Sequence, residues 1–374
     1  MRRHLENVYR LGVKELWGLI RDPMLLFLIV FTFTFSTYTA GTSMPETISN
    51  APLAIIDEDR SQLSQRIISA FYPPLFDVFE IELDEADPGM DNGIYTFVMD
   101  IPPSFQSDIL AGRTPSIQLN VDATRMSQAF TGSGYAQQIA MGEITEFMQR
   151  YRSVAQMPVE LEMRMRFNPN LTQSWFGALM DIINNITMMA IVLTGTALIR
   201  EREHGTIEHL LAMPVTPGEI MVSKVWSMGL VVLIASALSL VLIVQGVLAV
   251  RIEGSIPLFL AGVALHLFAT TAMGIFLATV ARNMPQFAML LILILMPLQM
   301  LSGSSTPRES MPKMVQNVMQ FAPTTHFVEL GQGILYRGAG IDVVWKPFLA
   351  LAVIGAVFFF VSLLRFRKTI TQMA

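Results

Sequence analysis

The sequence has no cysteine among its 374 residues and few charged side chains. Without cysteine the chain cannot form a disulfide or a Cys-ligated zinc or iron–sulfur site, so any domain outside the cytoplasm must be held by packing alone. Charged residues make up 15% of the chain, whereas soluble domains contain about 25%. Apolar residues make up 52%. This balance indicates an integral membrane protein.

The sequence also lacks the motifs of common nucleotide-binding and hydrolytic sites. A P-loop needs a Gly-Lys pair, because the loop amides and that lysine hold the phosphates, and none of the five lysines follows a glycine. No Gly-x-Ser-x-Gly elbow or His-Glu-x-x-His zinc motif occurs. His204 and His209 would lie about 140° apart on a helix, so they cannot bind a metal ion on one face. We therefore expect no catalytic, cofactor or metal site in this chain.

Six apolar stretches are long enough to cross a bilayer, whose hydrocarbon core needs about 20 residues of helix. The first follows a cationic lead-in of 23 residues, which is too long for a signal peptide, so we expect an uncleaved anchor. The expected spans cover residues 24–42, 177–199, 226–249, 256–280, 286–303 and 347–364.

Lysine and arginine are unevenly distributed between the segments that connect these spans. Residues 1–23 carry five and residues 199–225 carry three, whereas residues 250–255 carry only Arg251. Short loops rich in lysine and arginine stay on the cytoplasmic side of a membrane. We therefore expect both termini in the cytoplasm and residues 43–176 on the outer side.

Residues 43–176 alternate between strand and helix patterns and are rich in acidic side chains. We expect strands at residues 53–56, 77–83, 95–101, 117–121 and 159–167 and helices at 61–71, 104–110 and 126–151. This order predicts an α/β domain with a mixed sheet. Acidic clusters at 57–59 and 80–87 lack the spacing of an EF-hand, so we favour a solvated acidic surface over a calcium loop.

Residues 200–219, between the second and third spans, contain two helix starts. Gly205 ends the helix of the second span, and Thr206 can then cap a short helix that ends at Pro214. The apolar residues of that short helix are Ile207, Leu210 and Leu211. Residues 216–219 form a capping box with proline at the first helical position, which begins the next helix. The short helix either anchors the loop at the membrane surface or docks a cytoplasmic partner.

In this segment the sequence resembles the signature of the ABC-2 type transporter permeases, and among them the YhhJ-like permeases of bacterial inner membranes. The match is carried by Glu201, Arg202, Glu203, Gly205, Thr206, Glu208, Leu210, Leu211, Pro214 and Glu219. Met213 departs from the pattern, because many relatives have threonine there. Residues 101–105 resemble an Ile-Pro-x-x-Phe element of the family's outer domain, and residues 301–325 resemble the re-entrant segment before its last span.

The resemblance implies the fold of a type V exporter. This fold is an α-helical polytopic membrane protein with six transmembrane helices and an α/β periplasmic domain inserted between helices one and two. It implies a cytoplasmic interfacial helix at 1–23, a first transmembrane helix at 24–42, a periplasmic domain at 43–176 and a five-helix transmembrane region at 177–374. The last region would contain a coupling segment at 200–219 and a re-entrant outer segment at 304–345.

The resemblance also implies a function, the export of an unidentified substrate across the inner membrane by a dimer of two six-span halves. Whether the second half is the same chain or a different one stays open. This chain would bind no cofactor, and ATP-Mg would lie on a partner ABC ATPase. Some members also work with a periplasmic membrane-fusion protein, and no nucleic-acid partner is implied. The residues that couple to the ATPase would be Glu201, Arg202, Glu203, Gly205, Thr206, Glu208, Leu210, Leu211 and Pro214.

Polar side chains inside the expected spans are candidates for a translocation path, because polar groups are costly in a bilayer. The candidates are Asn184, Asn185, Thr187 and Gln299. The alternative is hydrogen bonding between helices, which asparagine and threonine often provide in bundles. We favour such a bond over a proton relay for His266, because its span contains no carboxylate.

Two other classes of function compete with the exporter. A non-transporting assembly or receptor protein would act through the outer domain and use the spans only as anchors, but six spans and a docking loop exceed that need. An intramembrane protease would need paired aspartates, or a serine with a histidine, inside its spans, whereas Asp181 and His266 are each alone. A partner ATPase would distinguish the exporter from the anchored protein.

Overall fold

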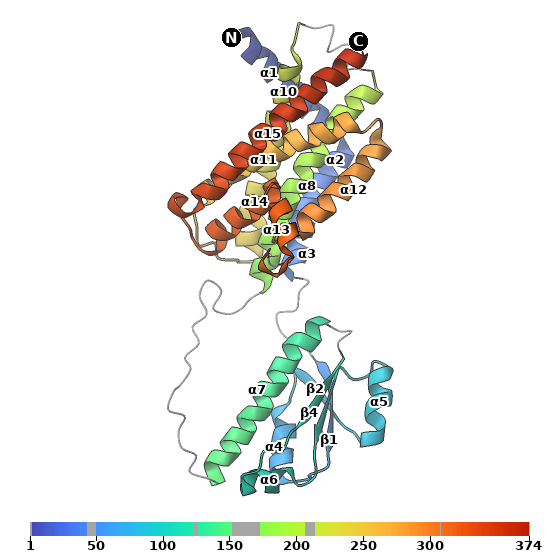
Figure 1. The fold of residues 1–374 in the computed structure, drawn as a ribbon, viewed down its shortest axis with the longest axis vertical. Coiled ribbons are helices and arrows are strands. Elements are labelled where there is room, and N and C mark those ends of the chain that lie inside the picture. The colour runs from blue at the N-terminus through green and yellow to red at the C-terminus, as the bar shows by residue number, and fades with distance from the viewer. Residues whose placement is uncertain are drawn as a thin grey trace. The chain divides into compact units, whose positions relative to one another are not determined.

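The computed structural model describes residues 2–42, 50–122, 126–151, 173–205, 214–306 and 308–373 of the chain. The chain divides into two compact units. The helical unit contains Met1–Met44 and Met165–Ala374, and the α/β unit contains Pro45–Arg164 (Figure 1).

The helical unit consists mainly of long apolar helices, and three of its helices, α2, α10 and α14, continue into π-helical segments. Before the α/β unit the chain forms α1 (Arg2–Ile20), α2 (Pro23–Phe31), the π-turn η1 (Thr32–Ser36) and α3 (Thr37–Thr42). After it come α8 (Gln173–Glu203), α10 (Pro217–Leu238), the π-turn η2 (Ser239–Val247), α11 (Ile256–Val280) and α12 (Met284–Met300). The last elements are η3 (Arg308–Ser310), α13 (Lys313–Met319), α14 (Pro323–Gly331), the π-turn η4 (Gln332–Tyr336) and α15 (Ile341–Met373).

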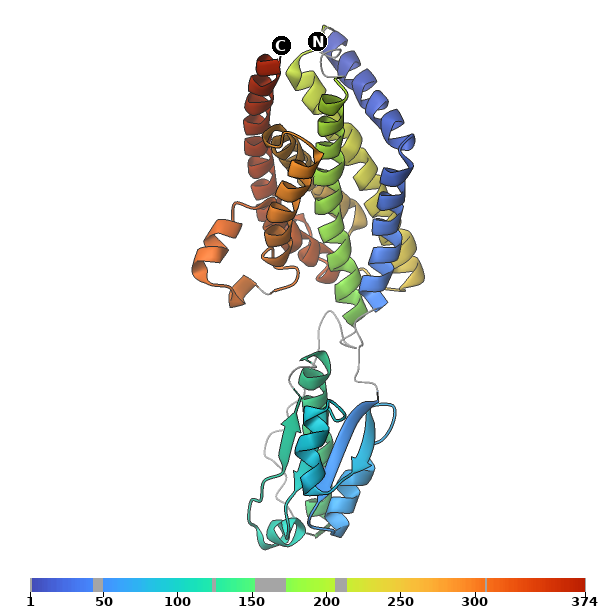
Figure 2. The same ribbon diagram turned by 90° about the vertical axis from the view of Figure 1, so that its right-hand side faces the viewer.

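The ends of several helices meet at one end of the helical unit. Helix α1 and the end of α15 lie there in both views (Figures 1 and 2). The end of α8 lies there too, because the Glu201 carboxylate accepts a hydrogen bond of 2.9 Å from Lys14 of α1. Helix α12 begins beside that end of α8 and runs back along it, so that Gln299 donates to the backbone oxygen of Asn184 at 3.5 Å.

Five helices among the described residues are long and apolar enough to cross a membrane. They cover Pro23–Thr42, Phe176–Glu203, Pro217–Val247, Ile256–Val280 and Ile341–Lys368, and each overlaps one of the spans expected from the sequence. The chain is therefore a mostly helical, multi-pass membrane protein.

The span expected at 286–303 falls on α12, which is shorter than predicted. Helix α12 has 17 residues and a length of about 25 Å, whereas the hydrocarbon core is about 30 Å thick. Pro297 removes one backbone donor near its end, and Gly303 adopts a φ of +99° in the turn that follows. The apolar run in the sequence therefore continues beyond the point where the helix stops.

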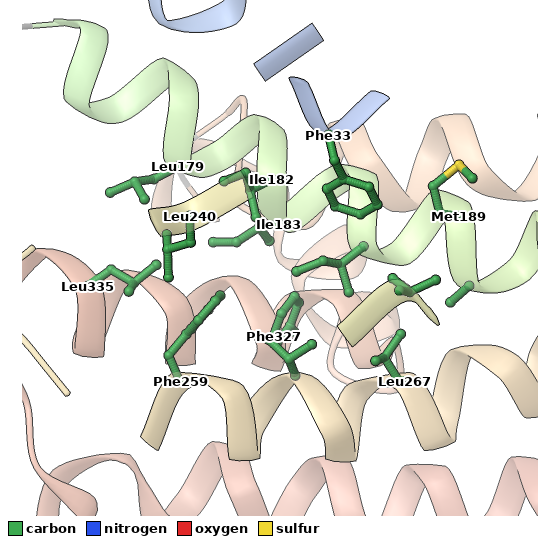
Figure 3. Packing of buried hydrophobic residues seen from close by; sticks show 14 of the residues in the cluster. Phe33, Leu179, Ile182, Ile183, Met189, Leu240, Phe259, Leu267, Phe327 and Leu335 are labelled. Carbon is green, nitrogen blue, oxygen red and sulfur yellow. The ribbon is translucent and has the colours of Figure 1, made fainter. Parts of the chain in front are cut away.

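The core of the helical unit is centred on α8 and α11. Figure 3 shows Leu179 and Ile183 of α8 on one side of this core and Phe259 and Leu267 of α11 on the other. Phe327 of α14 lies between the two α11 side chains and stacks on Phe259, with ring centroids 6.0 Å apart. By contrast, α2 and α15 bury few of their apolar side chains, as expected of helices that face lipid.

The α/β unit is a four-stranded mixed sheet with helices on both faces. The strands β1 (Ala51–Asp57), β2 (Phe76–Glu80), β3 (Phe97–Ile101) and β4 (Gln118–Val121) follow the spatial order β2-β1-β3-β4. Strand β1 is parallel to β2 and β3, and β4 is antiparallel to β3. The helices α4 (Gln62–Ala70), α6 (Phe105–Ala111) and α7 (Met126–Tyr151) cover one face, and α5 (Leu83–Asp91) covers the other (Figure 1).

Most elements predicted for this unit are confirmed. The strands at 53–56, 95–101 and 117–121 correspond to β1, β3 and β4, and the helices at 61–71, 104–110 and 126–151 correspond to α4, α6 and α7. The strand at 77–83 was predicted too long, because β2 stops at Glu80 and α5 follows. Acidic residues that we assigned to a solvated surface lie in the first turn of α5, where they favour a helix start. The strand predicted at 159–167 lies outside the described residues.

Candidate functional site

The last turn of α8 carries four consecutive charged residues, Arg200 to Glu203, which we call the α8 terminal turn. Neighbouring residues on a helix point about 100° apart, so these side chains contact different parts of the helical unit. Arg200 contacts the junction of α1 and α2, and Glu201 contacts α1 and α10. Arg202 contacts the end of α11, and Glu203 contacts the start of α12. One helical turn therefore joins five other helices.

Glu201 belongs to a charge network formed by Lys14, Glu15, Glu201 and Lys224. The Lys224 ammonium lies 2.7 Å from a Glu201 oxygen and 2.9 Å from a Glu15 oxygen, and Lys14 lies 2.9 Å from the other Glu201 oxygen. Lys224 is only 1% exposed, and Glu201 is buried. Burial holds the pKa of the Glu15 carboxyl above its ordinary value, although Lys224 opposes the shift. Two positive and two negative groups thus tie α1, α8 and α10 together with no net charge.

Arg202 and Glu203 bind the two sides of the turn between α11 and α12. The Arg202 guanidinium donates to the backbone oxygens of Ala278 and Ala281, where α11 leaves its last carbonyls without helical partners. The Glu203 carboxylate accepts from the Met284 amide of α12 at 2.8 Å. A cation at a helix end and an anion at a helix start each match the helix dipole. A displacement of the α8 terminal turn would therefore move both neighbours.

Asp22 connects Arg200 to the start of α2. Its carboxylate accepts hydrogen bonds of 3.1 Å from the Met24 and Leu25 amides and lies 2.6 Å from the Arg200 guanidinium. Burial alone would raise the pKa of the Asp22 carboxyl, but the Leu25 amide, Arg200 and the Met24 amide outweigh it and hold that pKa below its ordinary value.

The lowered pKa of Asp22 predicts a stability contribution that depends on pH. Because the folded pKa lies below the ordinary value of 3.8, the contribution is fully present at neutral pH and is lost as the pH falls through the folded pKa, below about pH 4. Asp22→Ala should cost about 0.5–2 kcal/mol at pH 7 through loss of the helix cap. Asp22→Asn keeps a capping oxygen and loses the ionisation, so it should cost less and remove this pH dependence. Thermal unfolding in detergent at pH 7 and pH 3 measures both, and equal pH dependence in wild type and Asp22→Asn would contradict this assignment.

A second set of contacts fixes α1 along α10. Thr216 and Glu219 form the predicted capping box at the start of α10, which is confirmed. The same Glu219 carboxylate contacts His4 at 2.9 Å and Asn7 at 3.1 Å, both on α1. The Trp226 indole donates to the backbone oxygen of Val8 at 3.2 Å. Helix α1 is therefore attached to the start of α10 as well as to the charge network.

The structure describes only part of the predicted coupling segment. Gly205 ends α8 with a φ of +67°, as predicted, and Pro214 precedes α10. Four predicted coupling residues lie outside the described residues: Thr206, Glu208, Leu210 and Leu211. The charged members that the structure describes, Glu201, Arg202 and Glu203, all contact other helices of the same chain.

Two candidate path residues lie in buried contacts between helices. The Asn185 amide donates to the Asp181 carboxylate at 2.6 Å and to the backbone oxygen of Thr32 in η1 at 3.1 Å. The Thr187 hydroxyl and the His266 ring lie 2.8 Å apart, so the hydrogen bond favoured for His266 is confirmed. Both contacts hold α8 against its neighbours, in the way polar groups often do in helical bundles.

The other two candidates, Asn184 and Gln299, meet at the contact between α8 and α12. Gln299 also accepts hydrogen bonds at its backbone oxygen from Ser302 and Ser304, each at 2.9 Å. A role for any of the four residues in a translocation path stays a prediction.

The side chains that the sequence did not single out are Glu15, Asp22 and Lys224. Lys224 counted only as one positive charge in a cytoplasmic loop, yet it is the most buried charge of the network. Its partner Glu15 is 209 positions away in the sequence, a separation that no local pattern reveals. The only signal was a lysine directly before an uncharged apolar run.

Within the described part of the chain, no three His, Asp or Glu side chains lie close enough to hold a metal ion. In the charge network the two carboxylates are paired with lysines. This arrangement suits a junction that keeps helix ends together and transmits their movement.

Comparison with known proteins identifies the family. Residues 23–364 match the family described as "ABC-2 family transporter protein". Over the full length of both chains the sequence is 64% identical to "Inner membrane transport permease YhhJ" of Escherichia coli strain K12. It is 26% identical to "Probable multidrug ABC transporter permease YbhR" of the same strain, over 92% of this chain and 93% of that one. It is also 26% identical to "Probable multidrug ABC transporter permease YbhS", over 94% of each chain. The chain therefore belongs to the ABC-2 family of transporter permeases.

Proposed function

We propose that this permease is one half of an ATP-driven exporter that moves its substrate outward across the bacterial inner membrane. The energy comes from an ABC ATPase on a separate chain, because the sequence has no P-loop lysine of its own. The observation that carries the proposal is the α8 terminal turn, which contacts five helices directly before the segment that resembles the family's coupling signature.

The proposed topology has six membrane crossings, with α12 as the short fifth one. Successive long helices alternate in direction, since α8 ends where α10 and α12 begin. We place this end in the cytoplasm because it carries Arg200, Arg202 and the basic end of α15. The α/β unit is then periplasmic, and α1 lies at the inner surface of the membrane.

The proposed coupling begins at residues 206–213, where the ATPase would bind through Thr206, Glu208, Leu210 and Leu211. Movement of the ATPase domains would displace the α8 terminal turn. Glu201 would pass this displacement to α1 and α10 through the charge network, and Arg202 and Glu203 would pass it to α11 and α12. Buried ion pairs are costly to break singly, so the joined helix ends would move as a rigid group. ATP-Mg stays on the ATPase, and this chain holds no cofactor.

The candidate path lies along α8, where Asn184, Asn185 and Thr187 occur, and at Gln299 of α12. The Gln299–Asn184 contact holds the two helices together. In the proposed cycle this contact breaks as α12 moves away from α8, which would expose Asn184 and Gln299. Asn185 and Thr187 would become exposed only if α8 also moved away from η1 and α11. A periplasmic membrane-fusion protein is a further proposed partner, for which the α/β unit is the candidate surface.

We propose that the second permease half packs against α12. A helix shorter than the bilayer core can be accommodated by association with another chain. The outer face of α12 borders an apolar hollow of about 610 Å³, lined by Met289, Ile292 and Leu293 among others. Leu293 itself is 69% exposed.

A cysteine cross-link tests this placement. Because this chain has no native cysteine, the reagent can attach to it only at the introduced one. Leu293→Cys should give a covalent product that contains a second permease chain when native membranes are labelled with a maleimide that carries a photoreactive benzophenone and then irradiated. Leu349→Cys on α15, which is also exposed, is the matched control and should give none. Gel mobility and mass spectrometry of the product distinguish a homodimer from a heterodimer. Cross-linking at Leu349→Cys but not at Leu293→Cys would place the second half elsewhere.

The proposed function is tested by purifying the tagged chain from its native membrane in mild detergent. We expect an ABC ATPase to co-purify in stoichiometric amounts and to hydrolyse ATP faster in the complex than alone. A chain that purifies without any ATPase, together with a periplasmic partner, would instead support a non-transporting anchored assembly protein.

A further inference from the structure

A second polar site lies at the other end of the helical unit, away from the α8 terminal turn. Here a cavity of about 570 Å³ opens between the turn after α12 and the α14–η4 segment. Its polar lining comes mainly from Ser302, Ser304, Arg308, Thr325, Glu329 and Arg337. Phe176 and Val328 supply an apolar part of the same wall.

Thr325 marks this cavity as a place for a ligand. Its side chain is 2% exposed, and its hydroxyl has no hydrogen-bond partner among the described residues. A buried hydroxyl that lines a cavity without a partner lacks a hydrogen bond that a ligand can supply. The neighbouring hydroxyls of Ser302 and Ser304 already bond to the Gln299 oxygen and to each other, so they fix the wall.

The charges around the cavity favour an anion. Arg308 and Arg337 form no ion pair with the described part of the chain, and neither does Glu329. Two guanidinium groups and one carboxylate leave one net positive charge. Guanidinium groups bind phosphate oxygens with two parallel hydrogen bonds, which makes arginine the side chain of choice for such groups.

The surroundings favour an anion that is attached to an apolar group. Helix α13 and the turn after it, which follow Arg308 in the sequence, expose Met314, Val318 and Phe321. Such side chains suit the boundary between lipid and water. We propose that this cavity binds the phosphate group of an anionic amphiphile, with Arg308 and Arg337 on the phosphate, Thr325 donating to it, and Phe176 and Val328 against the apolar part.

Protection of a single cysteine tests the site without ATPase or transport, so its outcome is independent of the proposed function. Ser305 is exposed and lines the cavity, and Ser305→Cys would be the only thiol of the chain. Dodecyl phosphate should slow maleimide labelling of this thiol by about tenfold at saturation, because the bound amphiphile covers it. The uncharged detergent dodecyl maltoside should give no such protection.

Three variants in the Ser305→Cys background identify the binding groups. Arg308→Gln with Arg337→Gln should raise the half-protecting concentration by at least about tenfold, because each arginine loses a charged hydrogen bond to phosphate. Glu329→Gln should lower it, because a repulsive carboxylate is removed. Thr325→Val should raise it while leaving the charges unchanged.

Inorganic phosphate, used as a second probe, separates the two sources of the anion. If inorganic phosphate protects the thiol at a similar concentration, the phosphate group alone accounts for binding. If only dodecyl phosphate protects it, the apolar chain also contributes to binding. Absence of protection by either probe, or equal protection in the double arginine variant, overturns the proposal. If the double variant does not fold, Glu329→Gln decides: weaker binding in that variant also overturns it.

Discussion

Replacing Lys224 by methionine should lower the free energy of unfolding of the helical unit by about 3–5 kcal/mol. Methionine keeps most of the side-chain volume, so the loss comes from charge and not from a cavity. Without Lys224, the carboxylates of Glu15 and Glu201 stay buried with only Lys14 nearby. A buried charge that loses its partner carries the full penalty of leaving water. Unfolding by titration with sodium dodecyl sulfate, monitored by circular dichroism, measures the loss.

Two further variants separate this charge effect from a general intolerance of substitution. Lys14→Met removes the exposed member of the network, which is 52% exposed, and should cost less than about 1 kcal/mol. The triple variant Glu15→Gln, Glu201→Gln, Lys224→Met removes the unpaired charges and should recover most of the stability lost by Lys224→Met. If Lys14→Met costs as much as Lys224→Met, or the triple variant is no better than the single one, the charge network is not the stabilising element.

Glu203→Lys should uncouple the permease from its ATPase while the protein still inserts in the membrane. A lysine at this position places a positive charge against the Met284 amide at the start of α12, where the helix dipole favours an anion. The expected stability cost is about 1 kcal/mol, the usual value of one helix cap. Coupling between two sites typically changes the affinity at one site by about 5–150-fold when the other is occupied. Loss of the coupling should therefore lower the stimulation of ATP hydrolysis by the permease by about tenfold or more.

Glu203→Gln is the matched control, because the amide oxygen can still accept from Met284. It should retain most of the stimulation, and both variants should reach wild-type amounts in the membrane. The measurement is the ATPase rate of the purified complex divided by the rate of the ATPase alone. Unchanged stimulation in Glu203→Lys would remove Glu203 from the coupling route.

Elements with strong local signals were predicted well from the sequence. Helix α7 was predicted with its observed limits, because its helical pattern of apolar residues, which includes Ile139, Ile144 and Phe147, is long and contains no proline. The start of α10 and the end of α8 were also predicted, since a capping box and a glycine at positive φ are defined by a few neighbouring residues.

Features that depend on distant contacts could not be predicted. The charge network brings together residues from α1, α8 and α10, and its key member Lys224 has no distinguishing local pattern. The same limit explains why Glu201, Arg202 and Glu203 were expected to couple to the ATPase, whereas in the structure they contact α10, α11 and α12 of the same chain. The span at 286–303 was predicted to end three residues too late, because residues 301–303 carry no charge and the helix end at Met300 has no strong local signal. Helix α5 was missed because its packing on β1 and β3, through Ala86, is not visible in an acidic sequence.

The central claim is that a separate ABC ATPase binds next to the α8 terminal turn, and a cross-link at residue 208 tests it most directly. The tagged chain with Glu208→Cys as its only thiol is labelled in native membranes with a maleimide that carries a photoreactive benzophenone. The covalent partner is then identified by mass spectrometry. We predict an ABC ATPase as the main partner, and we predict that Ser305→Cys, at the other end of the helical unit, captures none. No ATPase adduct at residue 208, or an equal amount at residue 305, would contradict the account.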